Sequence, residues 1–185
     1  MSQRSFASPI SHATHETAPA APTPHDALQS SADMRFVRET LALSALLGQI
    51  ALVRLHWNSL PAQIPTHFGF SGAPDAYGSK SSLLLLPIVS AVLYGILTVL
   101  SFFPQVFNYP VAVTRENRPR LEAISLALMG WLKVEIACLF AYLTWDTIRI
   151  AQGSLDGLGP AFLPILLVLL AATIAVGIVK MFRAR

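Results

Sequence analysis

The sequence predicts an all-α integral membrane protein with four transmembrane helices and a disordered N-terminal tail. Only 12% of the 185 residues are charged, about half the share found in soluble domains. Hydrophobic residues make up 54% of the chain, and the mean hydropathy is +0.55. They gather in runs of about 20 residues, the length at which a helix crosses a hydrocarbon core. Strict alternation is absent from these runs, so we expect helices rather than a closed barrel.

The charge and the cysteine content narrow the class of protein further. The net charge of +3 and the pI of about 9.4 are compatible with nucleic-acid binding. The basic residues, however, lie between apolar runs and not on one helix face, so we expect no nucleic-acid partner. The one cysteine, Cys138, excludes an intramolecular disulfide and a multi-cysteine metal site. Its apolar surroundings are typical of a buried, inert thiol.

Residues 1–34 form the predicted cytoplasmic tail, and residues 35–185 the transmembrane domain. The tail is rich in Ala, Ser, Pro, Thr and His and has almost no large aliphatic side chains. It cannot bury enough apolar surface to offset the entropy of ordering, so we expect disorder. No apolar run follows Arg4, which argues against a signal peptide. We favour a solvated tail over a weak metal-binding tract for its three histidines, His12, His15 and His25.

Two of the four predicted spans, residues 83–103 and 160–179, contain no charged residue. A water-soluble helix would show a polar face at 3.6-residue spacing, and neither run does. Their prolines, Pro87 and Pro164, fall in the first turns, where a missing N–H costs little.

The other two spans, residues 40–57 and 123–145, are interrupted by charges. Arg54 lies within one turn of the end of the first span, so its guanidinium can extend to the headgroups. Lys133 and Glu135 lie near the middle of the other span. Each span ends at a tryptophan, a residue enriched at the membrane interface.

Basic residues beside the spans predict the orientation. Eight lie on one side, against Lys80, Arg149 and the end-of-span Arg54 on the other. The positive-inside rule then places both termini and the loop 105–121 in the cytoplasm, and residues 58–82 and 146–159 outside. Loop 105–121 fits a lipid anchor, or a docking surface for a cytoplasmic partner. The eight residues are Arg35, Arg38, Arg115, Arg118, Arg120, Lys180, Arg183 and Arg185.

The first outward loop, residues 58–82, carries the most informative pattern. Three prolines fix φ, three glycines permit tight or left-handed turns, and apolar residues alternate with them. A flexible linker would be Gly/Ser-rich without such anchors. We therefore predict a compact, ordered loop at the membrane surface. Its structural positions are Pro61, Pro65, Phe68, Gly72, Pro74 and Gly78.

The motif in this loop is Leu-Pro-x-x-Ile-Pro-x-His-Phe, then Gly-x-Pro-Asp-x-Tyr-Gly-Ser-Lys before a transmembrane helix. It resembles an uncharacterised bacterial membrane domain that also occurs in SdpI-like proteins, over about residues 40–103. The Asn-Tyr-Pro and Arg-Glu-Asn-Arg runs of the next loop are similar to relatives of this family. The resemblance implies an inner-membrane protein with a role in immunity or signalling towards a secreted peptide toxin.

Four residues of the loop are candidates for ligand binding: His67, Asp75, Tyr77 and Lys80. Imidazole titrates near neutrality, so His67 could sense pH with Asp75 as its acidic partner. We favour the alternative in which both residues stabilise turns. Lys80 fits a headgroup contact or an ion pair with Asp75. Two ligands do not make a metal site, and no HExxH motif is present, so we expect no metal or other cofactor.

Lys133 and Glu135 form the second candidate site. A charge at mid-bilayer costs at least about 2.5–3.5 kcal/mol, so such residues normally face the bundle interior. Two positions apart, they point about 200° from one another around a helix and need separate partners. We expect a carboxylate for Lys133, and Arg54, Tyr94 or a second subunit for Glu135. The alternative is a helix that begins deeper, or a Lys133 that extends to the interface.

Two functions from different classes follow. The first is an SdpI-like sensor, immunity or binding component that meets a peptide ligand outside the cell or a regulator inside it. The second is a small transporter or channel component with Lys133 and Glu135 lining its pathway. An enzyme is not favoured, because catalytic triads, phosphate loops and paired carboxylates are missing. Small residues of the last span permit packing on another helix or a second copy; they are Ala171, Ala172, Ala175 and Gly177.

Overall fold

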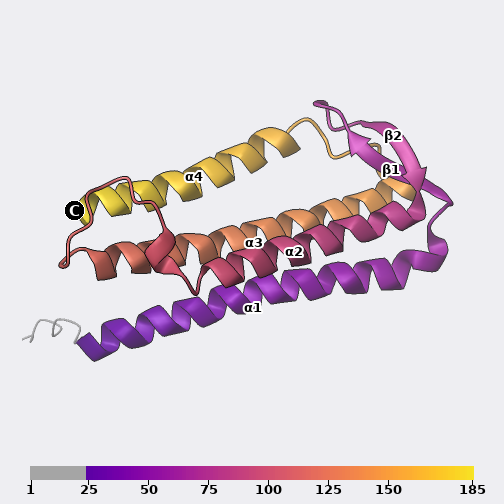
Figure 1. The fold of residues 1–185 in the computed structure, drawn as a ribbon. Helices are drawn as coiled ribbons and strands as arrows, with labels where there is room; N and C mark the ends of the chain where they lie inside the picture. The colour runs from indigo at the N-terminus through magenta and orange to yellow at the C-terminus, as the bar shows by residue number, and fades with distance from the viewer. Residues whose placement is uncertain (1–23) are drawn as a thin grey trace, which may run out of the picture.

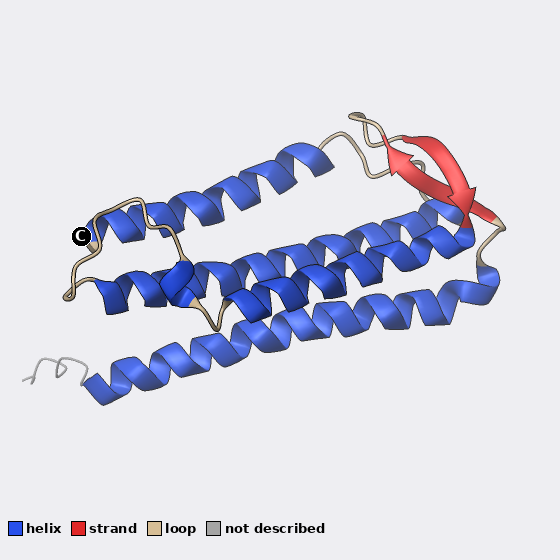
Figure 2. Ribbon diagram, in the orientation of Figure 1, coloured by secondary structure: helices blue, strands red, loops and turns tan. Residues whose placement is uncertain are grey.

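The computed structural model describes residues 24–185, which form an elongated bundle of four helices with a β-hairpin at one end (Figure 1). Figure 2 shows strands only at that end. The helices are α1 (Pro24–His56), α2 (Leu85–Leu100), α3 (Arg118–Ala151) and α4 (Phe162–Arg183), and the strands are β1 (Gln63–Phe68) and β2 (Pro74–Ser79). Short 3-10 helices span Trp57–Ser59, Lys80–Leu84 and Pro104–Val106.

Each of the four helices is long and apolar enough to cross a membrane, α2 together with the 3-10 turn before it. The predicted membrane fold with four helical spans is therefore confirmed. Successive helices run in opposite directions along the bundle (Figure 1). α1 and α3 have 33 and 34 residues, or about 50 Å each at the usual helical rise. Both extend well beyond a hydrocarbon core of about 30 Å.

α1 begins earlier than predicted. The sequence predicts disorder up to residue 34, whereas the helix already starts at Pro24. Proline suits the first helical position, because its fixed φ is helical and no N–H is needed there. No glycine or second proline interrupts residues 25–34, so the span continues into the polar sequence before it. The prediction of disorder for residues 1–23 lies outside the described residues.

α3 is the central helix and contacts α1, α2 and α4. α4 packs mainly on α3 and stands apart from the others in Figure 1. Only Gly177 and Met181 of α4 are buried, so most of its surface is left for lipid. A Cβ on Gly177 would lie 3.0 Å from a methyl carbon of Leu128, so this glycine permits close packing on α3. The other small residues of α4 predicted for packing are exposed.

The buried interior has two apolar clusters. The one nearest the hairpin joins the ends of α1 and α3 to the hairpin through Val53, Leu60, Ile64, Leu83 and Ile148. The other lies deeper in the bundle and contains Ala42, Val134 and Ala137.

A buried amide, Gln49, ties three helices together between these clusters. Its Nε2 donates to Ser90 Oγ of α2 and to the Ala137 carbonyl of α3, both at 3.1 Å. Such bonds within a membrane stabilise a bundle by about 0.6 kcal/mol on average. Gln49 is not among the predicted site residues, although it is the one amide side chain in the predicted first span.

Candidate functional site

Residues 58–82 fold as an antiparallel hairpin between two 3-10 turns, where the sequence predicted a loop without strands. β1 pairs with β2 from Gln63 opposite Ser79 to Phe68 opposite Pro74, with irregular register beside His67. Ile64 is 1% exposed and packs in the apolar cluster nearest the hairpin. Burial of this side chain fixes the hairpin on the ends of α1 and α3.

His67 and Asp75 face each other across the hairpin. His67 Nδ1 lies 2.6 Å from Asp75 Oδ1, and both side chains are exposed. An exposed pair of this kind adds little stability, so its chemistry is available to a ligand. Lys80 does not join the pair. Its Nζ lies 5.1 Å from the centre of the Trp57 ring and 3.5 Å from the Trp57 carbonyl, which it donates to.

Three glycines, Gly72, Gly157 and Gly159, let the hairpin tip approach the loop before α4; we call them the glycine clamp. The Leu158 N–H donates to the Gly72 carbonyl at 2.8 Å. Gly72 has φ of +78°, and a Cβ there would lie 2.5 Å from the Gly159 carbonyl oxygen. A Cβ on Gly157 would lie 2.5 Å from the Gly72 carbonyl oxygen. No side chain fits at either contact, so the clamp requires glycine.

The hairpin tip and the first turn of α4 enclose a pocket of about 380 Å³, which we call the outer pocket. The His67–Asp75 pair lies on its wall, and Phe70 beside it is 92% exposed. An exposed aromatic side chain next to a concave, partly charged surface is typical of an interaction site. The lining residues are His67, Phe68, Gly69, Phe70, Gly72, Asp75, Leu158, Gly159, Phe162 and Leu163.

Some of the residues predicted from the loop line the outer pocket, and others do not. Tyr77 is 61% exposed on β2, opposite Pro65, and does not line the pocket. Pro65 is buried, Pro74 is half-buried and Pro61 is exposed. A Cβ on Gly78 would lie 2.9 Å from the Thr66 methyl carbon, so this glycine serves strand packing.

Inside the bundle, Lys133 is 3% exposed and donates from Nζ to Glu39 Oε1 of α1. Nζ also donates to Thr98 Oγ1 of α2 at 3.4 Å, and the Tyr94 hydroxyl donates to Glu39 Oε2 at 2.7 Å. The carboxylate expected for Lys133 is therefore that of Glu39. Glu39 lies one residue before the predicted first span, 40–57. Lys133 points into the bundle and does not extend to the interface.

Glu135 lies on another side of α3 and is bound by α4. Thr173 Oγ1 donates to its Oε1, and its Oε2 is buried without a hydrogen-bond partner among the described residues. The predicted donors Arg54 and Tyr94 are wrong, because Arg54 is exposed and Tyr94 donates to Glu39. Lys133 and Glu135 line two neighbouring pockets, one between α1, α2 and α3 and the other between α1, α3 and α4. Both pockets are lined by Met34, Arg38, Ala123 and Ala127.

Metal-binding groups are absent among the side chains that the structure describes, those of residues 29 and 31–185. No group of three or more His, Cys, Asp or Glu side chains among them could hold a metal ion. Cys138 is exposed on α3, where sequence analysis expected a buried thiol.

The chain is similar to a family of unknown function and to an archaeal protein. A family model described as a domain of unknown function (DUF1648) matches residues 45–91, which cover the second half of α1, the hairpin and the start of α2. An uncharacterized protein of Archaeoglobus fulgidus is 38% identical over 133 residues, which are 60% of this chain and 72% of the archaeal protein. No solved structure gives a significant match.

Proposed function

We propose that this protein, which belongs to the same family as the Archaeoglobus fulgidus protein, is a membrane protein that binds a peptide ligand outside the cell in its outer pocket. The outer pocket is the observation that carries this proposal. Most of its lining comes from the hairpin, which lies within the segment matched by the family model. Aromatic side chains beside a few polar groups are the usual composition of a binding pocket.

The glycine clamp gives the ligand a route to the helices. Leu158 is bonded to the hairpin tip and lies four residues before α4. A ligand that displaces the tip therefore also displaces the start of α4. α4 in turn is bonded to α3 through Thr173 and Glu135. This connection favours a sensor or immunity component over a passive binding protein.

The resemblance of the loop motif to SdpI-like proteins supports a secreted peptide toxin as the ligand and an immunity or signalling role. We place both termini in the cytoplasm and the hairpin outside, because the eight basic residues lie away from the hairpin end. The inner membrane of a bacterium is the proposed location, while the relative from Archaeoglobus fulgidus is archaeal. A cytoplasmic partner at loop 105–121 and a second copy on α4 remain proposals.

A transporter with one pathway through Lys133 and Glu135 has less support. The two side chains lie on different sides of α3 and are bound by different partners, Lys133 by Glu39 and Glu135 by Thr173. We propose that the protein binds its ligand without catalysis, because the sequence contains no catalytic constellation. Proton flux into liposomes that depends on Lys133 would favour the transporter.

Expression of the protein in a strain that a secreted peptide toxin kills tests the proposal. We expect survival to rise, and the variant Phe70→Ser to lose this protection while its amount in the membrane is unchanged. Phe70 is almost fully exposed, so its loss removes a ligand contact and not a core contact. Tyr77→Ser is the matched control, because it removes an exposed aromatic ring from the same hairpin outside the pocket. Unchanged survival with the wild-type protein, or full protection by Phe70→Ser, would contradict the proposal.

A further inference from the structure

We propose that a second pocket, at the end of the bundle away from the hairpin, binds a phosphate-bearing anion, either a phospholipid headgroup or free phosphate. This basic pocket has a volume of about 380 Å³ and lies between α1, α2 and α3. It is separate from the outer pocket in place and in chemistry. Arg35, Arg38 and Lys133 contribute to its lining, and Glu39 is its one acidic residue.

The charges of the basic pocket do not balance. Glu39 is already bonded to Lys133 and Tyr94. No carboxylate among the described side chains lies within 4 Å of the Arg35 or Arg38 guanidinium. Two positive charges are thus left over in the lining, at the end of the bundle away from the hairpin, where Arg35 is exposed and Arg38 is half-buried. An anion that enters the pocket gains charge-assisted hydrogen bonds from them.

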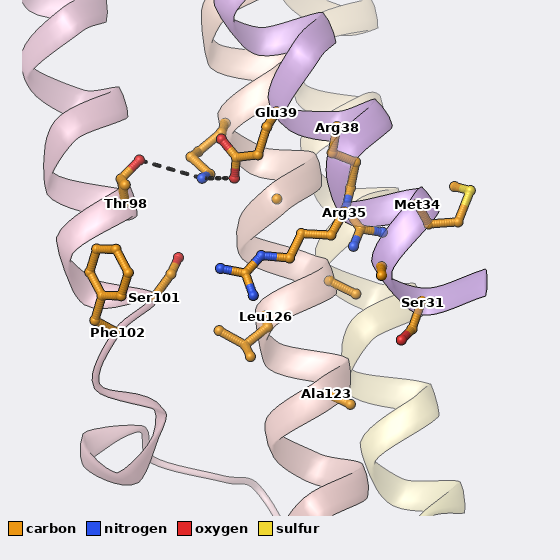
Figure 3. A pocket seen from close by; sticks show the side chains of 14 residues that line it. Ser31, Met34, Arg35, Arg38, Glu39, Thr98, Ser101, Phe102, Ala123 and Leu126 are labelled. Carbon is orange, nitrogen blue, oxygen red and sulfur yellow. Dashed lines mark hydrogen bonds and ion pairs between the residues drawn. The ribbon is translucent and has the colours of Figure 1, made fainter. Parts of the chain in front are cut away.

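Both arginines reach the pocket from one helix. They lie three positions apart on α1 and therefore share one face of the helix. Figure 3 shows Arg35 reaching from α1 towards α2, while the Arg38 side chain stays beside α1 with its end on the other side. Arg38 also lines the neighbouring pocket beside α4. A guanidinium presents two parallel N–H donors that match the spacing of two phosphate oxygens.

Gly130 of α3 holds Arg38 in this place. A Cβ on Gly130 would lie 2.7 Å from Arg38 Nε and 3.0 Å from Arg38 Cδ. The arginine stem therefore lies against the bare backbone of α3, which any larger residue would obstruct. This contact ties the guanidinium to the pocket and not to the bulk solvent.

The remaining walls limit what the anion can be. The hydroxyls of Thr98 and Ser101 donate to backbone carbonyls one turn earlier in α2, so the guanidinium groups must supply the binding. Met34, Phe102 and Leu126 give the pocket an apolar side. Basic pockets between transmembrane helices near the cytoplasmic surface are typical sites for anionic lipid headgroups. A phosphate bound by the guanidinium groups next to this apolar wall matches the chemistry of a phospholipid.

The test uses the full chain in nanodiscs of zwitterionic lipid, in buffer free of phosphate. Phosphatidylglycerol is added to one series and inorganic phosphate to another, and bound anion is counted by native mass spectrometry. We expect one phosphatidylglycerol per chain and a raised melting temperature. The double variant Arg35→Gln and Arg38→Gln lowers this affinity at least about tenfold. If inorganic phosphate binds and phosphatidylglycerol does not, free phosphate is the ligand, and the proposed anion site still stands.

Two further variants separate a built site from general attraction. Arg115→Gln with Arg120→Gln removes the same charge from the same end of the bundle, outside the pocket, and we expect affinity within about twofold of wild type. Gly130→Ala keeps every charge but obstructs Arg38, and we expect it to weaken binding while the melting temperature without anion stays near that of wild type. Equal losses in the two arginine pairs, or no binding of either anion, would overturn the proposal.

Discussion

Lys133→Met lowers the free energy of unfolding by about 3 kcal/mol, because it leaves the Glu39 carboxylate inside the bundle without its cation. We expect the lower end of the range for buried ion pairs, since the Glu39 side chain is 31% exposed. Glu39→Gln is expected to cost at least as much, because the abandoned Lys133 is almost fully buried. The measurement is the free energy of unfolding in a zwitterionic detergent.

The double variant Glu39→Gln with Lys133→Met separates the ion pair from the loss of packing. Removing both charges leaves no unpaired ion, so we expect the double variant to be at least about 1.5 kcal/mol more stable than the sum of the single losses predicts. Lys180→Met is the control for removal of a lysine, because Lys180 is exposed near the end of α4. Strict additivity of the two losses would mean that the pair contributes nothing.

Gly72→Ala separates the hairpin tip from the loop before α4. Alanine at φ of +78° is strained, and its Cβ would overlap the Gly159 carbonyl oxygen. We expect a local loss of at least about 2 kcal/mol, composed of backbone strain and the broken clamp. Hydrogen exchange at the Leu158 amide measures it directly, because that N–H donates to the Gly72 carbonyl.

Gly153→Ala is the matched control for this effect. Gly153 has φ of +74°, and nothing lies within 4 Å of its Cβ position. An alanine at this position therefore strains the backbone, but its Cβ overlaps no other atom. We expect about 1 kcal/mol of destabilisation, with no faster hydrogen exchange at the Leu158 amide. An equal effect of both variants on Leu158 exchange would show that the clamp does not hold the hairpin.

The four spans could be predicted because hydropathy over about 20 residues is a local property of the chain. The ends of the spans could not be predicted in this way, for a physical reason. Glu39 looked like the boundary of a span, since a carboxylate is costly in lipid. Its partner Lys133 is 94 residues away in sequence, and this pairing is what admits Glu39 to the bundle.

The hairpin could not be predicted from strand propensity. β1 contains a proline in its middle, and β2 begins with Pro-Asp, which are residues that disfavour strands. Tertiary packing overrides this preference, because Ile64 is buried against α1 and α3. The sequence offers Asp75 as a partner of His67, since both residues belong to one loop, but it favours the alternative in which both residues stabilise turns. The glycine clamp could not be predicted, because Gly157 and Gly159 belong to a different loop, the one between α3 and α4.

The central claim is that the outer pocket meets its ligand outside the cell, and the orientation of the hairpin tests it most directly. Ser71 is exposed at the hairpin tip, so Ser71→Cys in a Cys138→Ser background places a single thiol there. We expect a membrane-impermeant maleimide to label it in intact spheroplasts, and to label Arg185→Cys only after permeabilisation. Labelling of Arg185→Cys in intact spheroplasts, with Ser71→Cys protected until lysis, would place the outer pocket in the cytoplasm and contradict the account.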